Sequence, residues 1–350
     1  EQIVGDTFQY IIVGAGLAGA SAVEGIREVD KEGSILLIGF EAHLPYHRPP
    51  LSKKLWFGEE KVQDIFIHDR SYYAKTCHLL LQTTVTSIDL KNKKVDCSNG
   101  KLYRYEKLLL ATGGTPRRLS IPGGDDREIS YFRDLDDYTF LRSKVREGTS
   151  AVVIGGGFIG SEIAAALNLN KARVTMVFPD KYLVKRVFPE SVGRALQKRY
   201  EERGVKILSE DLPVVIERSN GTFITRTKAG QEIQSDVVIV GVGINPSIDL
   251  AKSAGLKVGN GIIVDEYLQT SDADVFAAGD NANFPYNFLQ KETRVEHWDN
   301  ALNQGKLAGK NMAGARVRYD YMPYFFSDLF EFGYEAVGEV DSSLETVTDW

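Results

Sequence analysis

The sequence predicts an α/β fold built around two copies of one strand, turn and helix unit. In residues 8–26, FQYIIVGAGLAGASAVEGI, an apolar strand runs into glycines and then into small residues that suit a helix packed closely on a sheet. Residues 151–169, AVVIGGGFIGSEIAAALNL, repeat this order. The glycines of the two copies are Gly14, Gly16, Gly19, Gly155, Gly157 and Gly160. A repeat of this kind indicates two related nucleotide-binding units.

Each glycine of such a motif has its own physical reason. The first lets the backbone turn sharply, the second lets a pyrophosphate approach the chain, and the third lets helix and strand touch. The phosphate then lies on the exposed N–H groups at the helix start. One copy alone is also compatible with an ordinary glycine-rich turn, and it is the pair that favours dinucleotide binding.

An acidic residue follows the second strand of each unit. Residues 34–40 form the first of these strands and Glu41 follows, 22 residues after the third glycine. Residues 173–178 form the other, and Asp180 lies 20 residues after its third glycine. This spacing places a carboxylate near a ribose hydroxyl. The alternative for Glu41 is a solvated surface carboxylate.

A stiff basic loop follows the first unit. In residues 44–57, LPYHRPPLSKKLWF, two adjacent prolines exclude regular helix and strand and fix an extended path. The loop carries Arg48 and Lys53. Arg48 suits a diphosphate, and Lys53 suits a point charge beside a cofactor ring. Without further context, each is equally compatible with a surface cation.

Residues 79–110 alternate like an antiparallel meander with a turn at 98–100, and the run stops on small residues after Thr112. A helix is expected over 190–202, ended by Gly204. The strand at 274–278 stops at Gly279, and Asp280 follows. Its carboxylate suits the hydroxyls of a sugar-alcohol chain, or serves as the N-cap of a following helix.

The last third of the chain predicts one long helix and an aromatic segment. Residues 293–314, TRVEHWDNALNQGKLAGKNMAG, are expected to be helical, with Glu296, His297 and Trp298 at the mouth. Residues 319–340 are dense in aromatic side chains and take a strand-like rhythm toward their end. We expect this segment to pack as core or interface.

Composition excludes several classes of protein. A formal net charge of −6 argues against a general nucleic-acid binder, and no specific nucleic-acid site is readable. Cys77 and Cys97 are too far apart for a CxxC redox pair or a metal knuckle, so both are interpreted as plain thiols and no metal is expected. No apolar run reaches the length of a membrane span. Because the chain starts at Glu1 rather than methionine, we expect that a leader was removed or trimmed.

Six ordered motifs resemble one enzyme family along nearly the full chain. They are GAGLAGA, PYHRPPLSK, LLLATGGTPR, VIGGGFIGSE, GIIVDEYLQTSDADVFAAGD and RVEHWDNALNQG. The chain resembles the FAD-dependent pyridine nucleotide reductases, in the branch of apoptosis-inducing factor and the ferredoxin and rubredoxin reductases.

The resemblance implies two nested Rossmann-like domains. Residues 1–127 and 258–325 would hold FAD, and residues 128–257, inserted between them, would hold NADH. Residues 326–350 would begin a C-terminal α+β interface domain, and we expect this domain to be incomplete because so few residues do not enclose a core.

The resemblance also implies roles for individual residues. The FAD contacts would be Gly14, Gly16, Gly19, Glu41, Arg48, Lys53, Thr112 and Asp280. The nicotinamide cofactor would be held by Gly155, Gly157, Gly160 and Asp180, and Phe158 would be the aromatic residue that covers the flavin until the nicotinamide displaces it. Asp180 favours NADH, because a carboxylate repels the extra phosphate of NADPH. Lys181, Lys185 and Arg186 lie close by in sequence and weaken that preference.

The catalytic prediction joins Lys53 to Glu162 as an ion pair near flavin N5. A cation there lowers the cost of the negative charge that arrives with a hydride from NADH, and the carboxylate keeps the ammonium in place. The alternative for Glu162 is a first-turn acid that interacts with its helix dipole. Glu296 would bond the nicotinamide amide, and His297 would lie beneath the N1 side of the flavin or else be a core histidine.

Two functions remain open at this point. The first is an enzyme that passes electrons from NADH through FAD to a small ferredoxin-type or rubredoxin-type iron–sulfur protein or to a quinone, as the segment WDNALNQG suggests. The second is a redox-sensing protein like apoptosis-inducing factor, whose NADH-reduced charge-transfer state controls homodimerisation and partner choice. His297 resembles that group, whereas Trp298 and Asn300 depart from its histidine-rich form. Direct thiol chemistry is not expected, because RPPLSKKLW stands where disulfide reductases carry their cysteines.

Overall fold

The protein was analysed as a computed structural model that describes residues 6–347 and 349, so Glu1 and Trp350 lie outside the described residues. The chain divides into two compact units. Unit 1 comprises the residues up to His47, Ile65–Thr115 and Pro246–Phe325, and unit 2 comprises Arg48–Asp64, Pro116–Asn245 and the residues from Phe326 onward. The basic loop from Arg48 onward and the aromatic segment from Phe326 onward therefore belong to unit 2.

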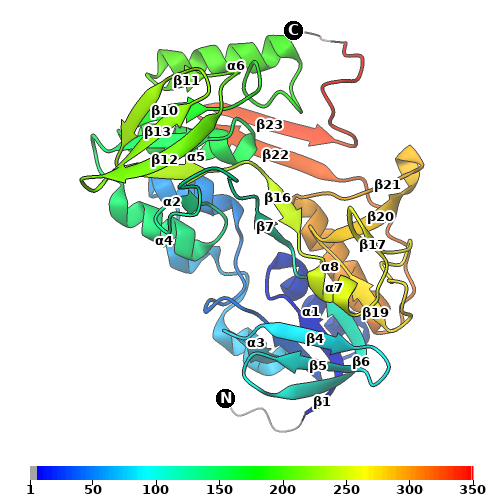
Figure 1. Ribbon diagram of the computed structural model, residues 1–350. Coiled ribbons are helices and arrows are strands. Elements are labelled where there is room, and N and C mark those ends of the chain that lie inside the picture. The colour runs from blue at the N-terminus through cyan, green and yellow to red at the C-terminus, as the bar shows by residue number, and fades with distance from the viewer. Residues whose placement is uncertain (1–5, 348, 350) are drawn as a thin grey trace. The chain divides into compact units, whose positions relative to one another are not determined.

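Unit 1 is built on a seven-stranded sheet whose parallel part places β1 (Thr7–Val13) between β2 and β6 (Figure 1). The apolar runs of these strands are buried on both faces, as expected for parallel strands covered by helices. The other strands of the sheet are β2 (Ile35–Ile38), β3 (His78–Leu80), β4 (Val85–Asp89), β5 (Lys94–Cys97), β6 (Leu102–Leu110) and β19 (Val275–Ala277). The expected antiparallel meander is confirmed for β4, β5 and β6, with Gly100 in the turn.

Helices α1 (Leu17–Val29) and α8 (Trp298–Met312) of unit 1 pack closely against each other. A Cβ on Gly305 would lie 2.2 Å from the Ala18 carbonyl oxygen, so only glycine permits this approach. Unit 1 also contains α3 (Arg70–Thr76), α7 (Asp249–Ser253), η3 (Asn287–Leu289), and a sheet of β17 (Val258–Gly259), β18 (Gly261–Ile263), β20 (Ala282–Tyr286) and β21 (Lys291–Thr293). The short η2 (Val62–Ile65) lies where the chain passes from unit 2 into unit 1.

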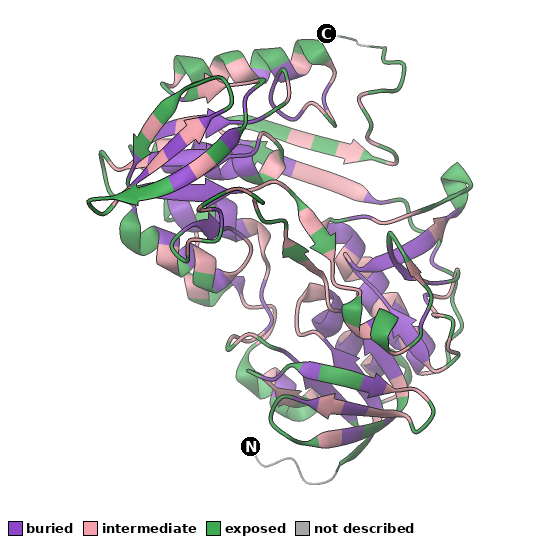
Figure 2. Ribbon diagram, in the orientation of Figure 1, coloured by how far each residue is buried: buried purple, intermediate pink, exposed green. Residues whose placement is uncertain are grey.

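Unit 2 is built on a five-stranded parallel sheet with β9 (Ser150–Ile154) between β10 and β15. Its strands are buried in a core of their own (Figure 2). The remaining elements of this layer are β8 (Ser130–Tyr131), β10 (Arg173–Val177), β11 (Lys206–Leu208), β15 (Val237–Val240), α4 (Leu135–Lys144), α5 (Phe158–Leu169) and α6 (Glu190–Glu202).

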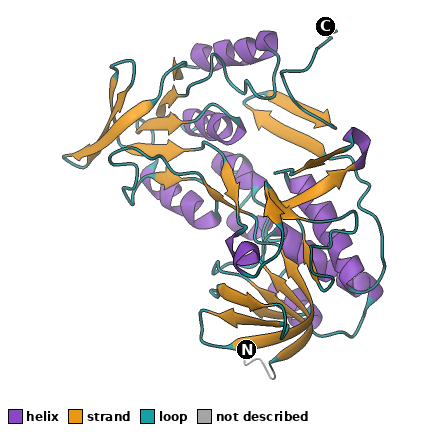
Figure 3. Cartoon of the chain, turned by 45° about the vertical axis from the view of Figure 1, so that its right-hand side comes forward, coloured by secondary structure: helices purple, strands orange, loops and turns teal. Residues whose placement is uncertain are grey.

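Two smaller sheets complete unit 2 (Figure 3). One is the antiparallel β12 (Pro213–Ser219), β13 (Thr222–Thr227) and β14 (Glu232–Ser235). The other is a hairpin of β22 (Tyr324–Leu329) and β23 (Phe332–Val337). The basic loop forms η1 (Pro49–Ser52) and α2 (Lys54–Phe57), while β7 (Gly114–Pro116) and β16 (Ile244–Pro246) lie where the chain leaves and re-enters unit 1.

The helix expected over 190–202 is confirmed, whereas two other expectations are wrong. Asp280 does not cap a helix, because the chain continues into β20. The helix expected from residue 293 begins only at Trp298, because residues up to Thr293 pair in β21 and the His297 side chain accepts a hydrogen bond from the Asp299 backbone N–H as the N-cap.

Candidate active site

The glycine loop of unit 1 has the geometry that its sequence predicts. Gly14 has a φ of +112°, and a Cβ there would lie 2.0 Å from the Ala111 carbonyl oxygen. A Cβ on Gly19 would lie 1.9 Å from the Gly14 carbonyl oxygen, so helix and turn touch. Gly16, in contrast, has no heavy atom within 4 Å of its Cβ position, and α1 begins there without a side-chain cap. The loop therefore leaves room for a phosphate at an open helix N-terminus.

The loop of unit 2 repeats this geometry. Gly155 has a φ of +121° and its Cβ would lie 2.1 Å from the Gly241 carbonyl oxygen, while a Cβ on Gly160 would lie 2.2 Å from the Gly155 carbonyl oxygen. Gly157 has open space at its Cβ position and precedes α5, which also lacks a side-chain cap. Each unit thus contains one glycine loop with open space at the start of a helix.

Residues around Asp280 in unit 1 fit a polar ligand. The Asn281 amide donates to Thr112 Oγ1 at 2.8 Å, and the Gln304 side-chain oxygen accepts from the Gly279 N–H at 2.9 Å. Asn281 Oδ1 and Gln304 Nε2 are buried and have no protein partner. Buried polar atoms of this kind require a partner, so a hydroxyl-bearing cofactor such as FAD, or water beside it, fits this position.

The two expected ribose-binding carboxylates follow their strands as predicted. In unit 1, Glu41 lies after β2 and its Oε2 accepts a hydrogen bond of 2.6 Å from the Tyr46 hydroxyl. In unit 2, Asp180 lies after β10, with Lys185 Nζ 3.9 Å from its Oδ1. One of the cations expected to weaken a preference for NADH therefore lies close to Asp180.

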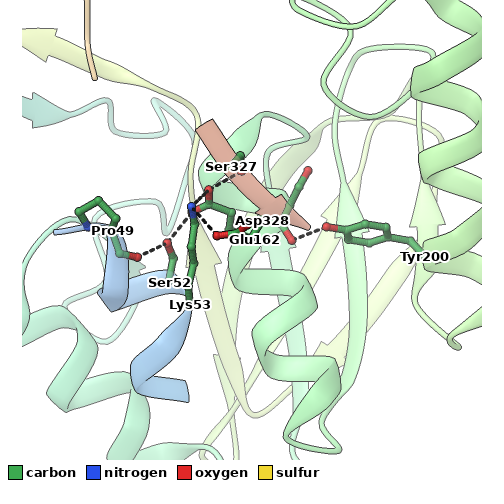
Figure 4. Close-up of polar contacts among 8 residues, drawn as sticks. Pro49, Ser52, Lys53, Glu162, Tyr200, Ser327 and Asp328 are labelled. Carbon is green, nitrogen blue, oxygen red and sulfur yellow. Dashed lines mark hydrogen bonds and ion pairs between the residues drawn. The ribbon is translucent and has the colours of Figure 1, made fainter. Parts of the chain in front are cut away.

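The expected ion pair between Lys53 and Glu162 is present in unit 2 (Figure 4). Lys53 lies where η1 meets α2, Glu162 lies in α5, and Lys53 Nζ is 3.2 Å from Glu162 Oε1. Each residue is only 6% exposed. Burying two charges costs free energy unless they are paired and hydrogen-bonded, so a buried ion pair that involves a loop residue is unusual.

Four contacts to the pair were not foreseen from the sequence. Ser52 Oγ donates to Glu162 Oε2 at 2.5 Å, and Ser327 Oγ donates to Glu162 Oε1 at 2.6 Å. Asp328 Oδ2 lies 3.7 Å from Lys53 Nζ, and the Phe326 ring centre lies 5.0 Å from it. Ser52 lies within the motif PYHRPPLSK, so the sequence had already drawn attention to its neighbourhood. For the β22 residues, the sequence offers only a polar pair, Ser-Asp, inside an aromatic strand.

The remaining expected site residues have protein contacts of their own. Arg48 Nη1 donates to the Arg133 carbonyl oxygen at 2.9 Å. Glu296 pairs with Arg294 at 2.6 Å, and the His297 ring lies 5.3 Å from that of Phe325. The Phe158 ring lies 5.4 Å from the Tyr334 ring and 5.9 Å from that of Phe188. Their roles toward cofactors stay predictions.

The cysteines carry no disulfide chemistry within the described residues. Cys77 and Cys97 are free thiols. Burial raises the pKa of Cys77 to about 12 and that of Cys97 to about 11. Both are therefore protonated at neutral pH, and protonated thiols are poor nucleophiles.

Within the described residues, no helix is long and apolar enough to span a membrane, and no group of acidic, histidine and cysteine side chains suits a metal ion.

Comparison with known proteins identifies the family. Residues 8–305 match the family model described as pyridine nucleotide-disulphide oxidoreductase, and residues 308–350 match the apoptosis-inducing factor, mitochondrion-associated, C-terminal model. Apoptosis-inducing factor 1, mitochondrial, of Dictyostelium discoideum is 34% identical, with 99% of this chain and 70% of that protein covered. The ferredoxin–NAD(+) reductase component of the anthranilate 1,2-dioxygenase system of Burkholderia cepacia is 36% identical, with 97% and 84% covered.

Solved structures agree with this result. The putidaredoxin reductase–putidaredoxin complex matches with a TM-score of 0.89 at 33% identity, covering 96% of this chain and 82% of that one. Ferredoxin reductase from Rhodopseudomonas palustris matches with a TM-score of 0.90 at 31% identity, covering 95% and 82%. The paired nucleotide loops and these matches show that the chain belongs to the pyridine nucleotide-disulphide oxidoreductase family, as a flavoprotein reductase that uses FAD and NAD(H).

Proposed function

We propose that this chain passes electrons from NADH, through FAD, to a small iron–sulfur protein of the ferredoxin or rubredoxin type. The observation that carries the proposal is the buried pair of Lys53 and Glu162, which suits hydride acceptance rather than thiol exchange. The bound flavin supplies the redox chemistry, since it accepts two electrons from a nicotinamide and delivers them singly.

Lys53 is proposed to hold a positive charge where negative charge develops. A preorganised cation in a water-poor site stabilises such charge more strongly than a solvated one does. Glu162 keeps the ammonium in place at 3.2 Å and is itself held by hydroxyl donors. The two residues therefore act as one unit, in which the carboxylate holds the cation in position.

The glycine loops are proposed to divide the two cofactors. The loop at Gly16 and the polar residues around Asp280 support FAD binding in unit 1, and the loop at Gly157 supports NADH binding in unit 2. Asp180 supports NADH over NADPH, because its carboxylate disfavours a second phosphate on the ribose. A ratio of kcat/KM for the two nucleotides tests this preference, and equal values contradict it.

Relatives support an iron–sulfur acceptor. Besides the Burkholderia cepacia protein, a rubredoxin-NAD(+) reductase of Pseudomonas putida is 35% identical and its putidaredoxin reductase is 34% identical. Steady-state oxidation of NADH by the FAD-loaded chain, measured with ferredoxin, rubredoxin, a quinone and oxygen at equal concentrations, tests this choice. We expect the iron–sulfur proteins to give the highest kcat/KM, and a quinone or oxygen that exceeds both contradicts the proposal.

A second candidate is a redox-sensing role, in which NADH-reduced FAD changes association between copies of the chain. It is supported by the C-terminal family match over 308–350 and by the Dictyostelium discoideum relative. Light scattering with and without NADH under anaerobic conditions separates the two candidates. A doubling of mass on reduction, together with slow reoxidation by ferredoxin, favours the sensor, whereas an unchanged mass favours the reductase.

A further inference from the structure

Three consecutive residues of β22 surround the Lys53 and Glu162 pair. Ser327 donates to Glu162 Oε1, and Asp328 lies 3.7 Å from Lys53 Nζ (Figure 4). Phe326 places its ring centre 5.0 Å from Lys53 Nζ. A C-terminal strand, more than 160 residues from Glu162 in sequence, thus contacts both members of the pair.

The two serine hydroxyls hold the Glu162 carboxylate from different sides. Ser327 donates to Oε1 at 2.6 Å and Ser52 donates to Oε2 at 2.5 Å. Ser327 is 2% exposed and Ser52 is 3% exposed, so water does not replace either donor easily. Because each carboxylate oxygen accepts a hydrogen bond, the orientation of the Glu162 carboxylate is fixed. The position of Oε1 relative to the Lys53 ammonium is then fixed as well.

Asp328 adds a second negative charge on the solvent side of Lys53. Its side chain is 61% exposed, whereas that of Glu162 is 7% exposed. The ammonium therefore lies between a buried carboxylate at 3.2 Å and an exposed one at 3.7 Å. The exposed partner contributes less, because water and salt screen it.

The hairpin has anchors that do not involve the pair. Glu331 in its turn bonds Arg199 of α6 at 2.5 Å and Arg203, the C-cap of that helix, at 2.8 Å. The adjacent Phe330 packs its ring 4.7 Å from that of Tyr200. A substitution confined to the side chain of Ser327 is therefore expected to leave the hairpin in place.

We propose that Ser327 and Asp328 are positioning residues for hydride acceptance, with Ser327 orienting Glu162 and Asp328 restraining Lys53. The inference rests on the proposed role of Lys53 and Glu162 and adds the C-terminal hairpin to that site. It makes β22 a determinant of the rate of flavin reduction, acting through the hydrogen bond from Ser327 to Glu162.

Anaerobic stopped-flow reduction of the FAD-loaded chain by NADH tests the role of Ser327. We expect Ser327→Ala to lower the limiting rate of flavin reduction about tenfold, the loss expected for one hydrogen bond to a charged group. The KM for NADH should stay unchanged. Ser327→Thr keeps a hydroxyl and should retain most of the wild-type rate. Ser327→Val has nearly the shape of the threonine variant but no hydroxyl, and should be as slow as Ser327→Ala.

Asp328→Asn is expected to slow the limiting rate about twofold to threefold at low salt, and less at high salt. Glu335→Gln is the matched control, because it removes one negative charge from an exposed position of the same hairpin. An Asp328→Asn rate equal to that of Glu335→Gln overturns the role of Asp328. A wild-type rate in Ser327→Ala, or equal rates in the Thr and Val variants, overturns the role of Ser327.

The double variant Lys53→Met with Glu162→Gln separates the two proposals. If it is slow while Ser327→Ala is normal, only the inference about the hairpin fails. If the double variant itself reduces its flavin at the wild-type rate, the proposed function of the ion pair fails, whatever the hairpin variants do.

Discussion

Replacing Lys53 and Glu162 together is expected to destabilise the protein less than replacing either residue alone. Removing one member of a buried pair leaves an uncompensated charge, which costs about 3–5 kcal/mol of stability. In the variant Lys53→Met with Glu162→Gln both charges are lost while the volume is kept. We expect FAD content near that of the wild type and a rate of flavin reduction by NADH about a hundredfold lower, measured by anaerobic stopped flow. A wild-type rate in a fully FAD-loaded double variant contradicts this expectation.

The open glycines allow the two cofactor sites to be separated. A Cβ at Gly16 or Gly157 would meet no heavy atom within 4 Å, so a side chain there would enter the open space in which we propose that a cofactor phosphate binds. We expect Gly16→Val to weaken FAD binding about tenfold or more, and Gly157→Val to raise the KM for NADH by a similar factor with FAD retained. Flavin content by absorbance and steady-state KM measure these effects.

Gly14→Val is the contrast to Gly16→Val. Its Cβ would lie 2.0 Å from a backbone oxygen at a φ of +112°, so the expected result is unfolding rather than selective loss of FAD. Equal losses of NADH and FAD binding in Gly16→Val and Gly157→Val would contradict the division of cofactors between the loops.

At the scale of elements, the start of α4 carries a pH-dependent carboxyl group. Asp137 accepts hydrogen bonds from the N–H groups of Arg133 and Asp134 in a capping box. Burial, followed by repulsion from Asp134, raises the pKa of Asp137 to about 6 from an ordinary value of 3.8. Between about pH 4 and pH 6, the folded state therefore holds a proton that the unfolded chain has released. The contribution of this protonation to the stability of the fold is full below about pH 4 and is lost as the pH rises through about 6.

Asp137→Asn should remove this pH dependence, because an amide does not titrate. The helix start should stay folded, because the amide oxygen still accepts the backbone hydrogen bonds. We expect the difference in melting temperature between the wild type and the variant to change between pH 4 and 6.5 and to be constant above that range. Asp125→Asn, which changes an exposed acid in the loop before β8, is the control. Parallel melting profiles for wild type and Asp137→Asn would contradict the raised pKa.

The elements that sequence patterns predicted best are those with local determinants. The repeated glycine loops and helix α6 follow from short motifs in which each residue type has one physical reason. The Lys53–Glu162 pair joins residues far apart in sequence and was predicted only with the family resemblance. The cap expected at Asp280 was wrong because an acid after glycine precedes a strand as readily as a helix. Ser327 and Asp328 were missed because their partners are distant in sequence, and no local pattern records such contacts.

At the scale of the whole molecule, two copies of one glycine loop are surrounded by different segments. Unit 1 adds buried polar atoms near Asp280, and unit 2 adds the buried ion pair with its loop and hairpin. The described cysteines remain protonated thiols, so the disulfide chemistry in the family's name has no support in this chain. Electron transfer to an external acceptor is the activity consistent with both observations.

The most direct test of this account is a double-mixing stopped-flow experiment on the FAD-loaded chain. Anaerobic mixing with one equivalent of NADH is followed by mixing with oxidised ferredoxin, and flavin absorbance is recorded throughout. We expect the absorbance to fall with NADH and to return with ferredoxin faster than with oxygen at the same concentration. Flavin that stays oxidised with NADH, or that ferredoxin reoxidises no faster than oxygen does, would contradict the account.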